Sequence, residues 1–147
     1  MTTEQIKCVQ ENWNLVQPLG IKVGELFYKQ LFAASPQLRS LFPESLEAQQ
    51  AKLVHMLQYI VDHLDHLHEI AHEVKQLGRR HYHYHALPHH YELIGKALVE
   101  TLQMASGNSW TQEISDAWRT AFNALRQMMI IAQEEERMLI EDKRERV

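Results

Sequence analysis

Residues 70–81 read IAHEVKQLGRRH, and this stretch decides how the chain is interpreted. Within it, apolar residues and a final histidine recur at intervals of four, three and four: Ile70, Val74, Leu77 and His81. That spacing predicts a helix with all four side chains on one face. His81 therefore ends a stripe directed at the core. A histidine there is either hydrogen-bonded within the core, the commoner case, or directed at a buried ligand.

The sequence after His81 favours a ligand. Residues 87–91 read LPHHY, and Pro88 marks the start of another amphipathic run. His81 is therefore expected where two helices meet at a break in the chain. A flat cofactor held between helices needs its axial ligand at such a place.

The bulk composition fits one domain, residues 1–147, with a charged helical tail from about residue 134. Hydrophobic residues make up 45% and charged residues 23% of the 147, as in ordinary globular proteins. The net charge of −4 and the pI of about 6.2 give no basis for a nucleic-acid partner. Protonation of all ten histidines would move the formal charge from −4 to +6, so charge should depend strongly on pH.

Cysteine content and hydropathy bear on location. Cys8 is the single cysteine, so no disulfide can form within the chain, which suits a reducing compartment. No apolar run reaches the roughly 18 residues of a membrane span, and residues 1–5 have no signal-peptide core. We therefore expect a cytoplasmic protein without a membrane span. The sequence leaves the oligomeric state open.

The periodicity predicts helices throughout, with no competing strand pattern. Thr2 and Gln5 form a possible capping box, and Ser35 before Pro36 is a strong helix start. Gly20 and Gly24 share a face on which another helix could approach closely. Further boundaries are expected at residues 18–20, 42–43 and 106–108. The fold class is therefore all-α, with about seven to eight helices and a long last one.

Five segments together resemble the globins, specifically bacterial single-domain haemoglobins and the haem domain of flavohaemoglobins. They are FYKQLF at 27–32, PQLRSLF at 36–42, LGRRH at 77–81, HYELIG at 90–95 and AWRTAF at 117–122. The resemblance runs from about Thr3 to Glu136. It implies a globin fold around a haem pocket.

The resemblance also implies a set of site residues. His81 matches the proximal ligand of a haem b iron, and Gln49 matches the distal position, with Gln50 as an alternative because the preceding connection is short. Tyr28 matches a distal tyrosine whose hydroxyl donates to a bound gas. Tyr91 and Glu135 match a proximal pair that, in flavohaemoglobins, hydrogen-bonds the ligand histidine. The expected haem contacts are Phe42, Gln49, Leu53, Leu77, His81, Leu87, Tyr91 and Ile94.

The implied function is reversible dioxygen binding, with nitric oxide dioxygenation when a separate reductase restores iron(II). Tyr28, Gln49, Tyr91 and Glu135 would then be the catalytic residues. Other diatomic ligands, NO and CO, are also expected to bind. The alternatives are an oxygen storage or delivery globin without significant turnover, and a haem-based gas sensor. We expect no flavin- or nicotinamide-binding part in this chain.

A competing motif occurs at residues 68–72, HEIAH, which is a literal H-E-x-x-H zinc-hydrolase pattern. Ile70 belongs to the apolar stripe, so His68 and His72 should flank that stripe rather than face a cleft. No third ligand follows at a suitable spacing. We therefore treat a zinc site as the outlying hypothesis. The other histidines are expected mostly at the surface: His55, His63, His66, His83, His85, His89 and His90.

Overall fold

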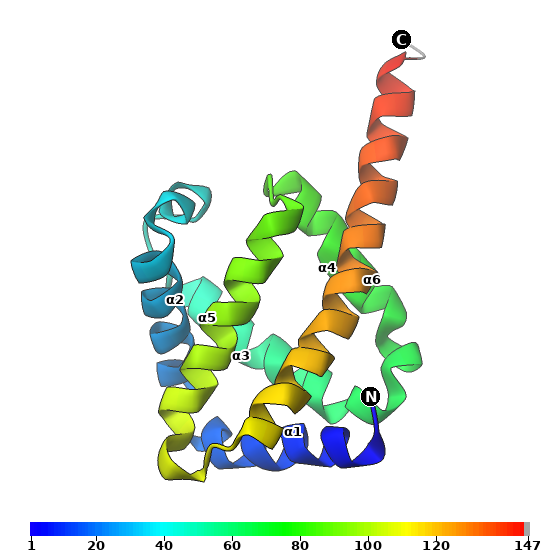
Figure 1. Ribbon diagram of the computed structural model, residues 1–147. Helices are drawn as coiled ribbons and strands as arrows, with labels where there is room; N and C mark the ends of the chain where they lie inside the picture. The colour runs from blue at the N-terminus through cyan, green and yellow to red at the C-terminus, as the bar shows by residue number, and fades with distance from the viewer. Residues whose placement is uncertain (146–147) are drawn as a thin grey trace.

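The computed structural model describes residues 1–145, and helices account for nearly all of them (Figure 1). The α-helices are α1 (Thr3–Val16), α2 (Ile21–Ala34), α3 (Glu47–Asp62), α4 (Ala71–His83), α5 (Pro88–Ser106) and α6 (Gln112–Glu145). Four 3-10 helices lie between them: η1 (Gln17–Leu19), η2 (Pro36–Leu41), η3 (Leu64–Ile70) and η4 (Gly107–Ser109). The described residues contain no strand, so the all-α prediction and the long last helix are confirmed.

Helix ends follow local chemistry. Thr2 and Gln5 form the expected capping box at the start of α1. Gly107 ends α5 with a positive φ of 58°, a conformation that favours glycine. Ser35 and Pro36 begin a helix as predicted, but it is the 3-10 helix η2, which leads directly to Phe42.

Two glycines allow helices to cross closely. A Cβ at Gly24 would lie 2.6 Å from the Gln50 carbonyl oxygen, so α2 and α3 touch backbone to backbone there. A Cβ at Gly78 would lie 2.5 Å from the Met129 carbonyl oxygen, so α4 and α6 do the same. Gly20 differs from expectation: its φ is 57°, nothing lies within 4 Å, and it serves the turn before α2.

A buried polar network joins α1, α5 and α6. Asn12 donates from Nδ2 to the Ser106 hydroxyl at 2.8 Å and accepts from the Trp118 indole N–H at 2.9 Å. Ser106 in turn donates to the Leu102 carbonyl at 2.6 Å. Because each buried polar group here has a partner, the network fixes how these three helices pack without a desolvation penalty.

The H-E-x-x-H motif does not lie on one α-helix. His68 is in η3, whereas His72 is in the first turn of α4, and both are exposed. In the described residues, no three His, Cys, Asp or Glu side chains are placed to hold a metal ion. The zinc-hydrolase hypothesis therefore has no structural support.

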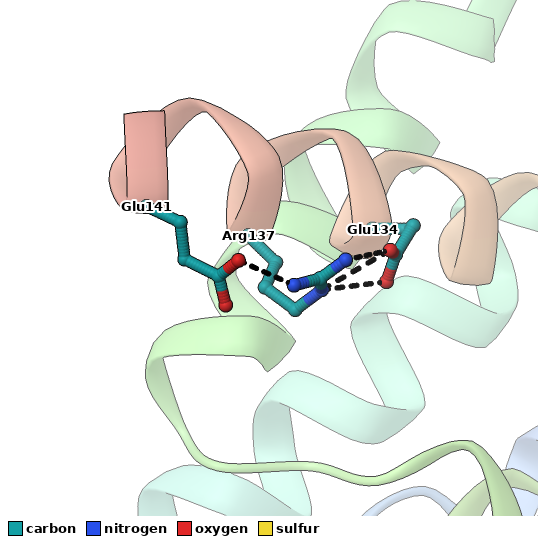
Figure 2. Close-up of polar contacts among 3 residues, drawn as sticks. All are labelled: Glu134, Arg137 and Glu141. Atoms are coloured by element: carbon teal, nitrogen blue, oxygen red, sulfur yellow. Dashed lines mark hydrogen bonds and ion pairs between the residues drawn. The ribbon is translucent and has the colours of Figure 1, made fainter. Parts of the chain in front are cut away.

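The last part of α6 extends beyond the other helices, as the red end of the ribbon shows in Figure 1. Arg137 bridges two successive turns there: its Nε donates to Glu134 at 3.0 Å and its Nη1 donates to Glu141 at 2.6 Å (Figure 2). The hydrogen bond from Arg137 lowers the pKa of Glu134. These i, i+3 and i, i+4 pairs support the solvent-exposed side of the last part of α6.

Replacing Gly78 by Ala should destabilise the protein by about 1–3 kcal/mol, because the new methyl group meets the Met129 backbone, which cannot rotate away. Gly95→Ala is the matched control. Its Cβ would meet the Phe122 ring, a side chain that can move, so the loss should be smaller. Denaturant unfolding of both variants checks the ranking. Equal losses would contradict the backbone contact between α4 and α6.

Candidate functional site

His81 lies in the last turn of α4 and is half-buried. Its Nδ1 is 2.7 Å from the Leu77 carbonyl oxygen. A carbonyl only accepts, so Nδ1 carries the proton and Nε2 has a free lone pair. Among the described residues, none forms a hydrogen bond with Nε2. The ring is thus held in the tautomer and orientation of a metal ligand.

The surroundings of His81 keep its imidazole neutral. Burial lowers the pKa of His81, outweighing the hydrogen bond to Leu77, which raises it, and nearby Arg80 lowers it further. Metal binding needs the neutral ring. His81 is therefore ready to bind a metal at neutral pH.

Tyr91 packs against the His81 ring. The two rings are stacked, with centroids 5.9 Å apart and planes 29° from parallel, and Tyr91 is buried at 2% exposure. Its hydroxyl donates to Gln133 Oε1 at 2.7 Å, and Gln133 Nε2 donates to the Ala86 carbonyl. Burial raises the pKa of Tyr91 to about 12, so the phenol stays protonated. Through these two hydrogen bonds, Gln133 of α6 connects α5 and the loop after α4 to α6.

Glu135 does not lie beside His81 and Tyr91. Its side chain is 54% exposed, and its carboxylate is 4.0 Å from the Arg79 guanidinium. The physical reason is the register of α6. Met129 faces α4 over Gly78, and the residue one turn further on that face is Gln133. Sequence reasoning missed Gln133, because the contact between Gly78 and Met129 that sets this register is visible only in the folded chain.

Tyr28 lies inside an aromatic cluster between α2 and the chain after η2. Its ring contacts three others at centroid distances of 4.9, 5.8 and 5.5 Å: Phe27, Phe32 and Phe42. Tyr28 is 7% exposed, and its hydroxyl has no hydrogen-bond partner among the residues that the structure describes. Burial raises the pKa of Tyr28 to about 12, so it remains a donor. Its oxygen is not among the fully buried unpaired polar atoms of the described residues, so it remains accessible to an incoming hydrogen-bond acceptor.

The expected distal residues flank the crossing of α2 and α3. Gln50 meets Gly24 through its backbone, Tyr28 lies one turn after Gly24, and Gln49 directly precedes Gln50. Both glutamines are half-buried. Leu53, one turn after Gln49, is half-buried and packs against the core.

The other expected contact residues vary in burial. Phe42 and Ile94 are half-buried and pack against the core. Leu77 is half-buried and supplies the carbonyl that His81 uses. Leu87 is 50% exposed at the residue before α5, so it is the expected contact least enclosed by protein.

The donor set fits a planar metal cofactor better than a bare ion. His81 supplies one free nitrogen, and in the described residues it belongs to no group of three or more His, Cys, Asp or Glu side chains that could hold a bare ion. A porphyrin supplies four further nitrogens and needs only such an axial ligand. On α2, the unpartnered Tyr28 hydroxyl could then face a small ligand of that metal.

Comparison with known proteins decides the family. The model of the globin family matches residues 25–129. The chain belongs to the globins. Membership implies haem binding, and the globin fold expected from sequence is confirmed.

Among curated relatives, the chain is 26% identical to a flavohemoprotein of Vibrio cholerae over 133 residues. That match covers 88% of this chain and 34% of the relative, so this globin spans about a third of the length of such relatives. A Campylobacter jejuni bacterial globin structure superposes with a TM-score of 0.79 at 18% identity, covering 91% and 97% of the two chains. The structure of an engineered carbene transferase from Rhodothermus marinus, named as a candidate nitric oxide dioxygenase, superposes with a TM-score of 0.87 at 19% sequence identity. The match covers 95% of this chain and 98% of the other.

Within the described residues, no helix is both long and apolar enough to cross a membrane. The extended α6 contains many charges and is not an exception.

Proposed function

We propose that this globin holds haem through His81 and binds dioxygen reversibly on the Tyr28 side. The observation that carries the proposal is a pair of polar groups that have no hydrogen-bond partner in the described residues and are not fully buried, His81 Nε2 and the Tyr28 hydroxyl. One is a ligand for a metal and the other is a donor for a small acceptor. Haem iron supplies the reversible affinity for diatomic gases that the side chains lack.

The haem should be the non-covalent b type. Covalent attachment through thioethers uses cysteines next to the ligand histidine. The single cysteine, Cys8, lies half-buried on α1, whereas His81 is on α4. A single half-buried thiol also suits a cytoplasmic location, which we include in the proposal.

On the distal side, Tyr28 and Gln49 would act as hydrogen-bond donors. Haem iron would supply the binding position for the gas, and these preorganised donors would stabilise negative charge that develops on the bound gas. The Tyr28 hydroxyl is held by aromatic packing rather than by a competing acceptor. It would therefore donate without first breaking a hydrogen bond inside the protein.

On the proximal side, neutral groups surround the ligand. His81 donates to a backbone carbonyl, and Tyr91 donates to the Gln133 amide. A carboxylate partner would raise the basicity of the imidazole and favour O–O activation. Because the partners are neutral, reversible binding is favoured over rapid oxidative turnover.

Nitric oxide dioxygenation is the second candidate. It is supported by the flavohemoprotein relatives and by the distal donor Tyr28. Turnover would need a separate reductase that supplies electrons to the haem. The decisive test is nitric oxide consumption by the dioxygen-loaded protein with a cell extract and NADH. A carrier reacts once per haem and stops, whereas a dioxygenase continues and forms nitrate.

Replacing Gln133 by Glu tests the proximal argument. A carboxylate at Gln133 would accept from Tyr91 and place negative charge near His81. We expect the iron–histidine stretching frequency to rise and the haem reduction potential to fall. Glu135→Gln is the control, because Glu135 is exposed and pairs with Arg79. If only the Glu135 variant shifts the frequency, the proposed arrangement is wrong.

A further inference from the structure

The first turn of α5 is capped by a histidine. The backbone N–H of Leu87 donates to Nδ1 of His90 at 2.9 Å. Leu87 precedes the helix and His90 is its third residue, which is the position where Glu or Gln closes a capping box. Leu87 has no side-chain oxygen of its own. His90 is therefore the side chain that caps this helix end.

This cap depends on the protonation state of His90. Nδ1 accepts the hydrogen bond, so it must carry no proton. Protonation would turn the acceptor into a donor and break the bond to Leu87. It would also place a positive charge at the N-terminal end of a 19-residue helix, where the helix dipole is already positive.

The groups around His90 do not stabilise its charged form. The His89 ring lies 4.4 Å away between ring centroids and offers no negative charge to a protonated His90. Glu92 on α5 pairs with Arg126 of α6, and Glu136 of α6 pairs with His83 of α4. Within the described chain, no carboxylate forms an ion pair with His90. Burial and nearby His89 both lower the pKa of His90.

The cap adjoins the segment that holds the proximal ligand. Ala86, next to Leu87, has its carbonyl bound by Gln133. Tyr91, next to His90, donates to the same Gln133 and stacks on His81. Loss of the cap would loosen both ends of this short segment. The orientation of Tyr91 against His81 would then be less fixed.

We propose that His90 is an acid-sensitive switch that releases the start of α5 and weakens the hold on the proximal ligand. The stabilisation is complete above the unfolded-state pKa of about 6.5 and is lost as pH falls through the lower folded-state pKa. The effect on haem rests on the proposed function. The cap itself does not, and it can be tested separately.

The first experiment follows the Leu87 amide by NMR between pH 7.5 and 5. After correction for intrinsic exchange, its protection should fall as the His90 ring titrates, by about twofold to thirtyfold, the range a helix cap supplies. His90→Gln keeps an acceptor at all pH values and should keep the protection. His89→Gln is the matched control and should behave like the unaltered chain. Unchanged Leu87 protection across the His90 titration overturns the proposal.

The second experiment measures haem release over the same pH range. Acid also protonates His81, so release will rise in every variant. The proposal predicts a smaller rise in His90→Gln than in His89→Gln. If haem release rises equally in the two variants while Leu87 protection behaves as predicted, the link to the proximal ligand is overturned and the cap stands. If the protein binds no haem, the proposed function is refuted. The Leu87 amide experiment still tests the cap, because it does not depend on haem.

Discussion

His81→Ala should lose haem. The substitution removes the free Nε2 that we propose as the axial ligand, and no other described histidine lies at this point of α4 facing Tyr91. The haem-to-protein absorbance ratio after purification measures the loss. We expect this absorbance ratio to fall by tenfold or more, because the bond between the iron and its protein ligand raises the affinity for haem by several powers of ten.

The matched control for His81→Ala is His83→Ala, two residues further on the same helix. His83 is exposed and contacts Glu136 at 3.3 Å, so its removal should leave haem content unchanged. Circular dichroism must show that both variants remain helical. As a rescue, His81→Gly should regain the haem spectrum when free imidazole is added. Unchanged haem content and spectrum in His81→Ala would refute the assignment of the ligand.

Tyr28→Phe should release dioxygen faster. The change removes the hydroxyl and keeps the ring that packs against Phe27 and Phe42. A hydrogen bond to a charged acceptor contributes about 1.5–3 kcal/mol, so the release rate should rise roughly tenfold or more. Stopped-flow displacement of dioxygen by carbon monoxide measures this rate.

The control for the distal side is Tyr59→Phe, since Tyr59 is a half-buried tyrosine of α3 outside the Tyr28 cluster. Its variant should release dioxygen at the unaltered rate. Gln49→Leu tests the second donor, and Gln50→Leu tests the alternative that the sequence left open. If Tyr28→Phe and both glutamine variants release at the unaltered rate, the pocket does not use these donors.

Local sequence patterns predicted much of the fold. The spacing from Ile70 to His81 predicted the core-facing stripe, and the structure buries Ile70 and Val74 almost completely. The Thr2 cap and the Pro88 start were equally visible, because caps and proline depend on neighbouring residues alone. The 3-10 form of η2 could not be predicted in this way, since α-helices and 3-10 helices share these start signals.

The site was less predictable, because it depends on the relative rotation of distant helices. The α6 stripe through Ala121, Leu125 and Ala132 suggested an inward Glu135. The contact of Met129 with Gly78 instead turns Gln133 toward Tyr91. Side chains two positions apart point about 200° apart around a helix, so the choice between Gln133 and Glu135 depends on which face of α6 meets α4, and the Gly78 contact that sets this face cannot be read from the stripe. The roles of Tyr28 and Gln49 remain predictions for the experiments above.

The most direct test of the account is the absorption spectrum of the purified iron(II) protein, recorded without gas, under dioxygen, and after dioxygen is removed. We predict a haem spectrum with one axial ligand, a shift under dioxygen and a return when the gas is withdrawn. Absence of haem would contradict the role of His81. A spectrum with two protein ligands that dioxygen does not alter would contradict an open, Tyr28-facing site for the gas.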